Sequence, residues 1–136
     1  MAETLRLEIV TPQATVLSED VLMVTLPAIE GQIGVYPNHV PLITPIVPGE
    51  ILVETEKGER FLAVGGGLVE VTRTRVSVIT DMAVASEQID EAKVEEARAR
   101  AAARLEEKIS DEEVASVNAS LARSLAQLQV KRRRHM

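Results

Sequence analysis

The chain has no cysteine and no tryptophan, and its 136 residues include one tyrosine, one phenylalanine and two histidines. Without cysteine there is neither a disulfide framework nor a thiolate nucleophile. So few aromatic rings make the chain a poor candidate for stacking against bases or sugars. Two histidines, one of them beside the C-terminus, argue against a structural zinc site, and we expect no metal. The core therefore has to be built from valine, isoleucine, leucine and alanine.

Long apolar runs are also absent. No stretch approaches the roughly 20 apolar residues that a membrane-spanning helix needs, and the N-terminus lacks a basic region followed by an apolar run. We therefore expect any membrane association to be through partners. The net charge of −6 falls on residues 1–85, with 11 acidic and 5 basic residues, whereas residues 86–136 hold 10 of each. An acidic body of this kind is not suited to binding nucleic acid.

Short alternating segments dominate the first part of the chain. Leu5, Leu7 and Ile9 alternate with polar residues, which is typical of a half-buried strand. Apolar runs recur as far as Val76–Ile79, separated by turn residues and by prolines such as Pro45. Short strands at this spacing predict a β-sandwich or flattened barrel, which we place at residues 1–85.

The second part of the chain has a helical composition. Residues 90–109 lack glycine, proline and threonine and are rich in alanine, glutamate and arginine. Asp90 is a candidate N-cap, and Ser110 with Glu113 forms a capping box that begins a second helix. Residues 86–136 therefore predict a hairpin of two amphipathic helices. The predicted apolar stripe is Val94, Ala97, Ala101, Leu105 and Ile109 on the first helix and Val114, Val117, Leu121, Leu125 and Leu128 on the second.

No catalytic set can be assembled from these residues. The triplet Gly65–Gly67 lacks the lysine of a phosphate-binding loop and precedes a strand, so close strand packing explains it better. His39 has no evident serine or acidic partner. The acidic pair Glu95 and Glu96 is expected on the solvent face of a helix, with Glu96 pairing to Arg100. We predict that the protein is not an enzyme by itself.

Residues 30–42 read E-G-Q-I-G-V-Y-P-N-H-V-P-L and predict an ordered loop between strands. This segment resembles the signature loop of epsilon subunits of bacterial and plastid F-type ATP synthases. Residues 61–71, F-L-A-V-G-G-G-L-V-E-V, and residues 89–101, I-D-E-A-K-V-E-E-A-R-A-R-A, resemble two further segments of that family, in the same order. The similarity covers nearly the whole chain.

The resemblance implies a non-catalytic rotor subunit in the central stalk of a proton-transporting ATP synthase. The sandwich would bind the gamma subunit and the ring of c subunits and couple ring rotation to ATP synthesis. The helical tail would either lie on the sandwich or extend into the alpha/beta catalytic head and inhibit ATP hydrolysis. The protein would be peripheral, on the cytoplasmic face of a bacterial plasma membrane or on the stromal face of the thylakoid.

The resemblance also implies three groups of site residues. The loop residues expected to face the c-ring or gamma are Glu30, Gln32 and His39. The tail cations expected to contact beta subunits are Arg98, Arg100, Arg104, Lys108 and Arg123.

The third group is a nucleotide motif, of which Ile89, Asp90 and Arg123 match the family pattern. Lys93 and Gln127 replace arginines, and Val94 replaces an alanine. Because lysine lacks the planar fork that grips phosphate, we expect weak ATP binding or none, and no other cofactor. Two alternatives to the rotor subunit stay open: an ATP-sensing module without a rotor role, and an enzyme that borrows residues from a partner. The missing catalytic groups count against the enzyme.

Overall fold

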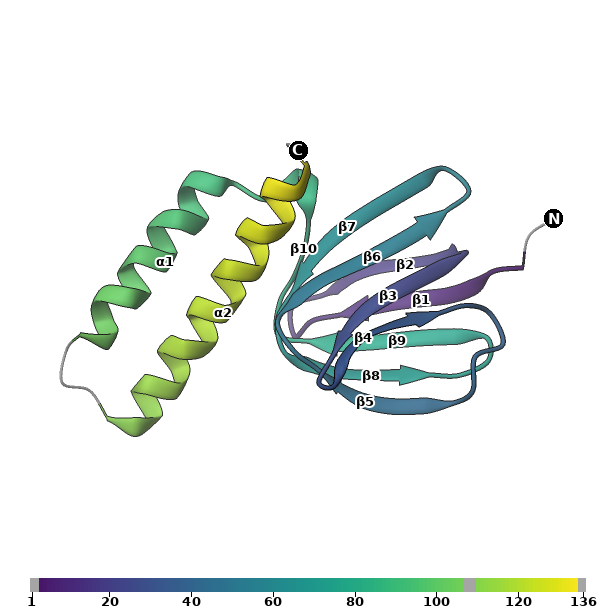
Figure 1. Cartoon of the computed structure of the whole chain (residues 1–136), viewed down its shortest axis with the longest axis horizontal. Helices are drawn as coiled ribbons and strands as arrows, with labels where there is room; N and C mark the ends of the chain where they lie inside the picture. Colours follow the sequence, from purple (N-terminus) through teal and green to yellow (C-terminus); the bar gives the residue numbers. More distant parts are fainter. Residues whose placement is uncertain (1–2, 107–109, 135–136) are drawn as a thin grey trace.

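The structure is a computed structural model that describes residues 3–106 and 110–134, and it consists of a ten-stranded sheet followed by two helices (Figure 1). The strands are β1 (Leu5–Val10), β2 (Thr15–Val21), β3 (Met23–Ala28), β4 (Gly31–Val35), β5 (Leu42–Ile46), β6 (Gly49–Thr55), β7 (Gly58–Val64), β8 (Gly67–Val71), β9 (Arg75–Thr80) and β10 (Ala83–Ala85). A short 3-10 turn, η1 (Ser86–Gln88), leads to α1 (Glu91–Leu105) and α2 (Asp111–Arg134). The predicted fold class is confirmed.

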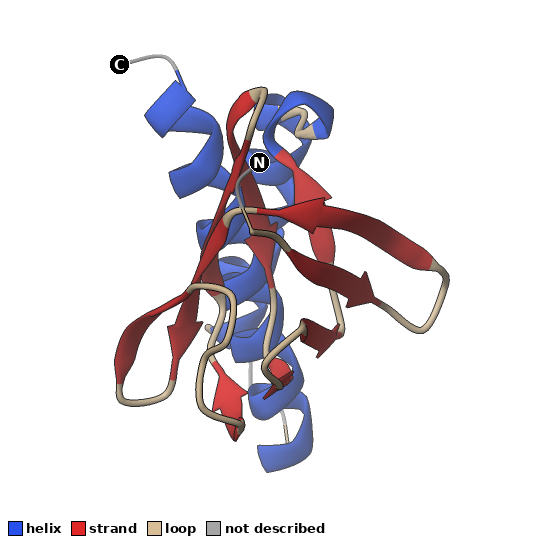
Figure 2. Ribbon diagram, turned by 90° about the vertical axis from the view of Figure 1, so that its right-hand side faces the viewer, coloured by secondary structure: helices blue, strands red, loops and turns tan. Residues whose placement is uncertain are grey.

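The sheet runs in the order β10-β7-β6-β3-β5-β8-β9-β1-β2. Strand β4 lies outside this order and pairs with β3. Among the strands that the structure describes, only β1 and β9 pair in parallel. The sheet folds back on itself as a sandwich, and the two helices lie side by side to one side of it (Figure 1) and behind the strands in Figure 2. The core is aliphatic, as the composition requires. Its buried members are Leu5, Leu7, Ile9, Val21, Val24, Leu26, Val35, Ile46, Ile51, Val53, Leu62, Val64, Val69, Val71, Val76 and Val78.

Two details of the predicted strands are wrong. Residues 30–42 are not a loop throughout, because Gly31–Val35 form β4, which pairs with β3 through partners such as Leu26 and Ile33. Pro45 does not end a strand but lies within β5, opposite Leu68. A proline is tolerated there because β5 pairs fully with β8 alone and meets β3 only at Ile46, so one edge of the strand needs few backbone donors.

The helix starts follow the predicted capping residues. The Asp90 carboxylate accepts a hydrogen bond from the Lys93 amide at 3.2 Å, and the Ser110 hydroxyl accepts one from the Glu113 amide at 3.2 Å. Each bond satisfies an amide that the first turn of a helix leaves without a partner. Both predicted caps are therefore confirmed.

The burial of α2 departs from the predicted apolar stripe. Val117 and Leu128 are buried as expected, but Leu125 is 54% exposed. In addition, Ala126 and Val130 are buried in a cluster with Ala63 of β7. The helix therefore has a second buried face, turned toward the sandwich, that the stripe does not include. No residue of α1 is buried, and Ile109 of its predicted stripe lies outside the described residues. Within the described part of the chain, neither helix has the length and apolar content to cross a membrane.

Candidate protein-binding surfaces

An apolar row crosses the outer face of four neighbouring strands. Sheet register sets Pro45 opposite Leu68 and Leu68 opposite Ile79, and Ile79 in turn pairs with Val10. Ile43, two residues before Pro45, lies on the same face. We call these five residues the apolar row. Leu68 is 42% exposed, Ile79 60% and Ile43 64%, which is unusual for neighbouring large apolar side chains on a protein surface.

The sequence analysis did not find this row, although a signal was present. Leu68 is followed by Val69 and Ile79 is preceded by Val78, so both strands carry adjacent apolar residues. Val69 and Val78 point into the core and are fully buried, which leaves Leu68 and Ile79 on the outer face. Adjacent apolar residues at one end of a half-buried strand therefore indicated that the outer face is also apolar there.

The rest of this outer face is charged. The Arg75 guanidinium lies 3.4 Å from the Glu8 carboxylate, and Arg6 lies 3.3 Å from Asp20. These ion pairs join β9 to β1 and β1 to β2. The face is thus divided into an apolar end and a polar end, which is the pattern of an apolar contact patch with a polar surround.

The three residues of the predicted ring contact do not form one site. Glu30 follows β3 and Gln32 lies on β4, and both line a hollow together with Leu42 and Thr44 of β5. His39 lies in the loop beyond the other end of β4, where its Nδ1 is 2.6 Å from the Val40 carbonyl oxygen. The structure therefore brings Glu30 and Gln32 together and places His39 apart from them.

The loop that carries His39 is held in place. Asn38 adopts a left-handed backbone conformation with φ of 69°, which asparagine tolerates better than most residues. Its amide donates to the Arg73 carbonyl at 2.8 Å, and its side-chain amide donates to Glu3 at 3.1 Å. These bonds join the loop to the β8–β9 turn and to the chain before β1.

The described tail cations are all engaged within the chain. Arg100 lies 3.0 Å from Glu96 on α1, as the sequence predicted, and Arg104 lies 2.7 Å from Glu113 on α2. Arg98 pairs with Glu95. Lys108 lies outside the described residues. In the folded hairpin, these arginines therefore face acidic partners of their own chain.

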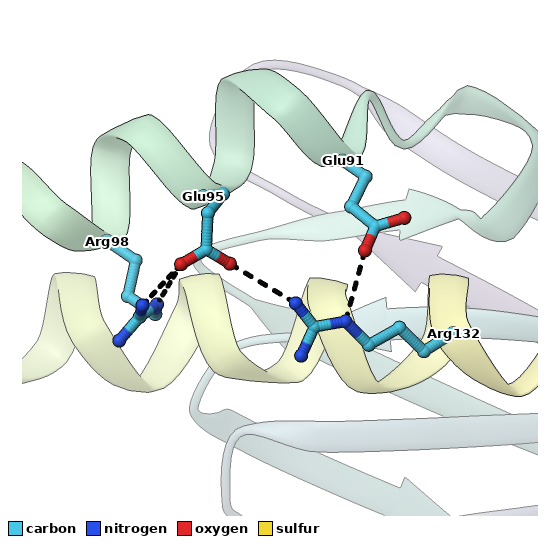
Figure 3. Close-up of polar contacts among 4 residues, drawn as sticks. All are labelled: Glu91, Glu95, Arg98 and Arg132. Carbon is cyan, nitrogen blue, oxygen red and sulfur yellow. Dashed lines mark hydrogen bonds and ion pairs between the residues drawn. The ribbon is translucent and has the colours of Figure 1, made fainter.

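A four-residue cluster joins the start of α1 to the end of α2 (Figure 3). Arg132 donates from Nε to Glu91 at 3.0 Å and from Nη2 to Glu95 at 3.3 Å, while Arg98 donates from Nε to the other oxygen of Glu95 at 2.9 Å. The hydrogen bond from Arg98 is the main cause that lowers the pKa of Glu95. Desolvation opposes it as the second-largest cause and raises the pKa, while the positive charges of Arg98 and Arg132 each lower the pKa by a smaller amount. The prediction that both glutamates face solvent holds for Glu96 but only in part for Glu95, whose half-exposed side chain also reaches across to Arg132 of α2.

The residues of the predicted nucleotide motif are dispersed. Ile89 is buried in the cluster with Ala63, and Asp90 caps α1. Lys93 is exposed between Glu91 and Glu95, both of which contact Arg132. Arg123 lies nine residues before Arg132 on α2, which is about 13 Å along the helix axis at 1.5 Å per residue. Lys93 and Arg123 are therefore not brought together.

Arg123 is instead turned toward the sandwich. Its Nη1 lies 3.1 Å from Oδ2 of Asp81, in the turn between β9 and β10, and its Nη2 donates to the Ser120 hydroxyl at 3.1 Å. One helical turn later, the Gln127 side-chain amide contacts the Met82 sulfur at 3.5 Å. Two consecutive turns of α2 thus meet two consecutive residues of the connection between β9 and β10.

Comparison with known proteins identifies a family for both parts of the chain. A family model described as the beta-sandwich domain of the ATP synthase delta/epsilon chain matches residues 4–86. A second, described as its long alpha-helix domain, matches residues 87–132.

Individual proteins give the same result. The chain is 41% identical over 127 residues to the ATP synthase epsilon chain of Alkalilimnicola ehrlichii, covering 93% of this chain and 91% of that one. It is 38% identical to that of Chromobacterium violaceum, with 96% and 98% of the two chains covered. Among solved structures, a chain of the Euglena gracilis mitochondrial ATP synthase OSCP/F1/c-ring assembly superposes with a TM-score of 0.76 at 25% identity, covering 93% of this chain and 79% of that chain. This chain therefore belongs to the ATP synthase delta/epsilon family, as an epsilon chain of the F-type enzyme.

Proposed function

We propose that this protein is a non-catalytic rotor subunit in the central stalk of a proton-transporting ATP synthase. In this role it couples rotation of the c-ring to ATP synthesis in the alpha/beta head. The observation that carries the proposal is the apolar row, a contact surface on a chain similar to one from an F1/c-ring assembly. A subunit of this kind acts through binding surfaces, which agrees with the lack of a catalytic set in the sequence.

The apolar row is the proposed surface for the gamma subunit. A partner that covers its exposed isoleucine and leucine side chains would gain binding free energy of about 25 cal/mol per Å² of apolar area removed from water. The adjacent ion pairs of β1 and β9 would form the polar rim of that interface. Residues 1–85 would therefore hold gamma without help from the tail.

Glu30 and Gln32 are the proposed contact with the c-ring, because they line one open hollow between β4 and β5. His39 would make a separate contact, since it lies beyond the opposite end of β4. Through the ring the protein would be peripheral to the membrane, on the cytoplasmic face in a bacterium.

The tail is proposed to inhibit ATP hydrolysis when it extends into the head and sets Arg98, Arg100, Arg104, Lys108 and Arg123 against acidic loops of the beta subunits. In the folded hairpin the described members of this set are already ion-paired. Extension would exchange the pairs between α1 and α2, and between α2 and the sandwich, for contacts with beta.

The gamma proposal is tested by co-purification of the full chain with a gamma subunit. We expect Leu68→Glu combined with Ile79→Glu to abolish co-purification, because two charges would replace the apolar centre of the row. The matched control is Leu125→Glu, which charges an exposed leucine of α2. Retained binding by a folded Leu68→Glu, Ile79→Glu double variant would show that gamma binds elsewhere.

The alternative function, an ATP sensor without a rotor role, makes the opposite prediction. An ATP sensor has no need of the apolar row, so the double variant would behave like the original chain in every assay, co-purification with gamma included. The separation of Lys93 from Arg123 supports the rotor proposal over the sensor.

A further inference from the structure

The turn between β9 and β10 is held by several hydrogen bonds and contacts α2. The Thr80 side chain is 3% exposed, and its hydroxyl lies 3.0 Å from the Gly66 carbonyl oxygen and 3.2 Å from that of Met82. The Gly65 amide donates to the Met82 carbonyl at 2.9 Å, and the Asp81 amide to the Gly66 carbonyl at 3.3 Å. These bonds hold the backbone on either side of Asp81, whose carboxylate lies against Arg123 of α2.

Gly65 supplies the space for that carboxylate. A Cβ atom at Gly65 would lie 1.8 Å from Oδ1 of Asp81 and 3.4 Å from Cδ of Arg123. Real side-chain carbons do not approach an oxygen so closely, so any residue other than glycine would displace Asp81 from Arg123. Gly66 differs, since a Cβ there would meet only the Ile46 carbonyl oxygen at 3.8 Å.

The face that α2 turns to the sandwich has a mixed character. Arg123, Ala126, Gln127 and Val130 follow each other at the spacing of one helix face. Ala126 and Val130 are buried in the small cluster with Ala63 and Ile89. The two side chains that α2 itself contributes to this cluster are small, so they constrain the position of the helix along the sheet less than larger apolar side chains would. An ion pair with fixed geometry supplies the missing constraint.

We propose that the Asp81–Arg123 pair, seated over Gly65, is a latch that sets the position of α2 on the sandwich and holds the tail in its folded state. The first glycine of the triplet is therefore required by the tail rather than by the sheet. The latch also occupies Arg123, so that this arginine becomes available to any other partner only when α2 leaves the sandwich. The proposal concerns the isolated chain and stands whether or not the rotor function holds.

The test uses the absence of cysteine from the chain. In the full-length protein, Ala126→Cys places one thiol on the sandwich-facing side of α2, at a position that is 4% exposed. Its rate of modification by a small thiol reagent then measures how often α2 leaves the sandwich. A second background, Val69→Cys, places the thiol in the sandwich core and measures global unfolding instead.

In the Ala126→Cys background we expect Asp81→Asn and Gly65→Ala each to raise the modification rate, by up to about fivefold for a partly exposed ion pair. Gly66→Ala is the matched control and should leave the rate unchanged. Combining Asp81→Asn with Gly65→Ala should add little to either change, because both remove the same contact. Rates in the Val69→Cys background should not change.

Two results would overturn the latch. The first is an unchanged rate at Ala126→Cys in both single variants, which would mean that the apolar cluster alone holds α2. The second is an equal rise in both cysteine backgrounds, which would mean that Gly65 and Asp81 stabilise the sandwich as a whole. Neither result bears on gamma binding, which is measured separately.

Discussion

Arg132 and Glu91 lie 41 residues apart in the chain, and yet the Nε atom of Arg132 donates to the Glu91 carboxylate at 3.0 Å. Together with the Arg104–Glu113 pair at the other end of the hairpin, this contact ties α1 to α2 at both ends. Because no residue of α1 is buried, ionic contacts contribute a larger share of its attachment than they do in an apolar seam. The hairpin should therefore respond to pH and salt.

The first prediction concerns acid. Since the pKa of Glu95 in the folded hairpin is below its ordinary value of 4.5, ionised Glu95 stabilises the fold at neutral pH. The stabilisation by ionised Glu95 is complete above the ordinary pKa, and it is lost as the pH falls through the lowered pKa of the folded state. We expect helix content, followed by circular dichroism, to decrease on acidification below about pH 4.5.

Glu95→Gln should remove part of that acid sensitivity and weaken the hairpin at neutral pH. The control is Glu112→Gln, which alters an exposed glutamate in the first turn of α2. If Glu95→Gln and Glu112→Gln change the acid transition equally, the cluster of Figure 3 does not hold the hairpin.

The second prediction concerns the last glycine of the triplet. A Cβ atom at Gly67 would lie 2.0 Å from the Ile79 carbonyl oxygen, which belongs to the neighbouring strand and cannot move away cheaply. We expect Gly67→Ala to lower the free energy of unfolding by about 1–3 kcal/mol, the usual cost of overpacking. Chemical denaturation measures this change. Gly34→Ala, at a strand position where a Cβ meets nothing within 4 Å, should be close to neutral, and equal effects at both glycines would contradict the argument.

The third prediction concerns ATP. Lys93 and Gln127 stand where the resembled motif has arginines, and Arg123 is paired with Asp81. We expect a dissociation constant in the millimolar range or weaker, which corresponds to about −4 kcal/mol. Isothermal titration of the full chain with ATP measures this affinity. Micromolar binding would show that the replaced residues and the separation of Lys93 from Arg123 do not matter.

The fourth prediction concerns inhibition in the assembled complex. Neutralising Arg98, Arg100 and Arg104 together should raise ATPase activity without releasing the subunit, and deletion of residues 86–136 should raise it at least as much. Because attraction between exposed charges is screened within about 10 Å at 0.1 M salt, inhibition should also weaken as ionic strength rises. Steady-state ATP hydrolysis, measured over a salt series, tests both effects.

A matched pair of variants separates two roles of a tail arginine, its ion pair within α1 and its positive charge toward the catalytic head. Arg100→Gln and Glu96→Gln both break the same 3.0 Å ion pair of α1, but only Arg100→Gln removes a cation from the tail. We expect inhibition to fall in Arg100→Gln and to persist in Glu96→Gln. Unchanged hydrolysis after the tail deletion, at every nucleotide and salt concentration, would leave the tail as a structural cap only.

Local sequence determined the elements of this protein. Alternation from Leu5 onward predicted strands, and Asp90 and Ser110 marked both helix starts, because capping and half-burial depend on residues within one turn or one strand. The aliphatic core followed from the lack of aromatic residues. The sequence did not predict that part of residues 30–42 forms a strand, since glycine and proline are compatible with both a loop and the short strand β4.

Tertiary structure alone decided which residues meet. The apolar row exists because sheet register aligns Leu68 with Ile79 and Val10, and register between distant strands is not encoded by any one of them. The sandwich-facing side of α2 combines Arg123 and Gln127 with Ala126, a set that no hydrophobic pattern reveals. Its polar members are satisfied by Asp81 and Met82, which the fold brings there from another part of the chain. Long-range polar contacts of this kind depend on the whole packing arrangement, and for that reason only the folded structure revealed them.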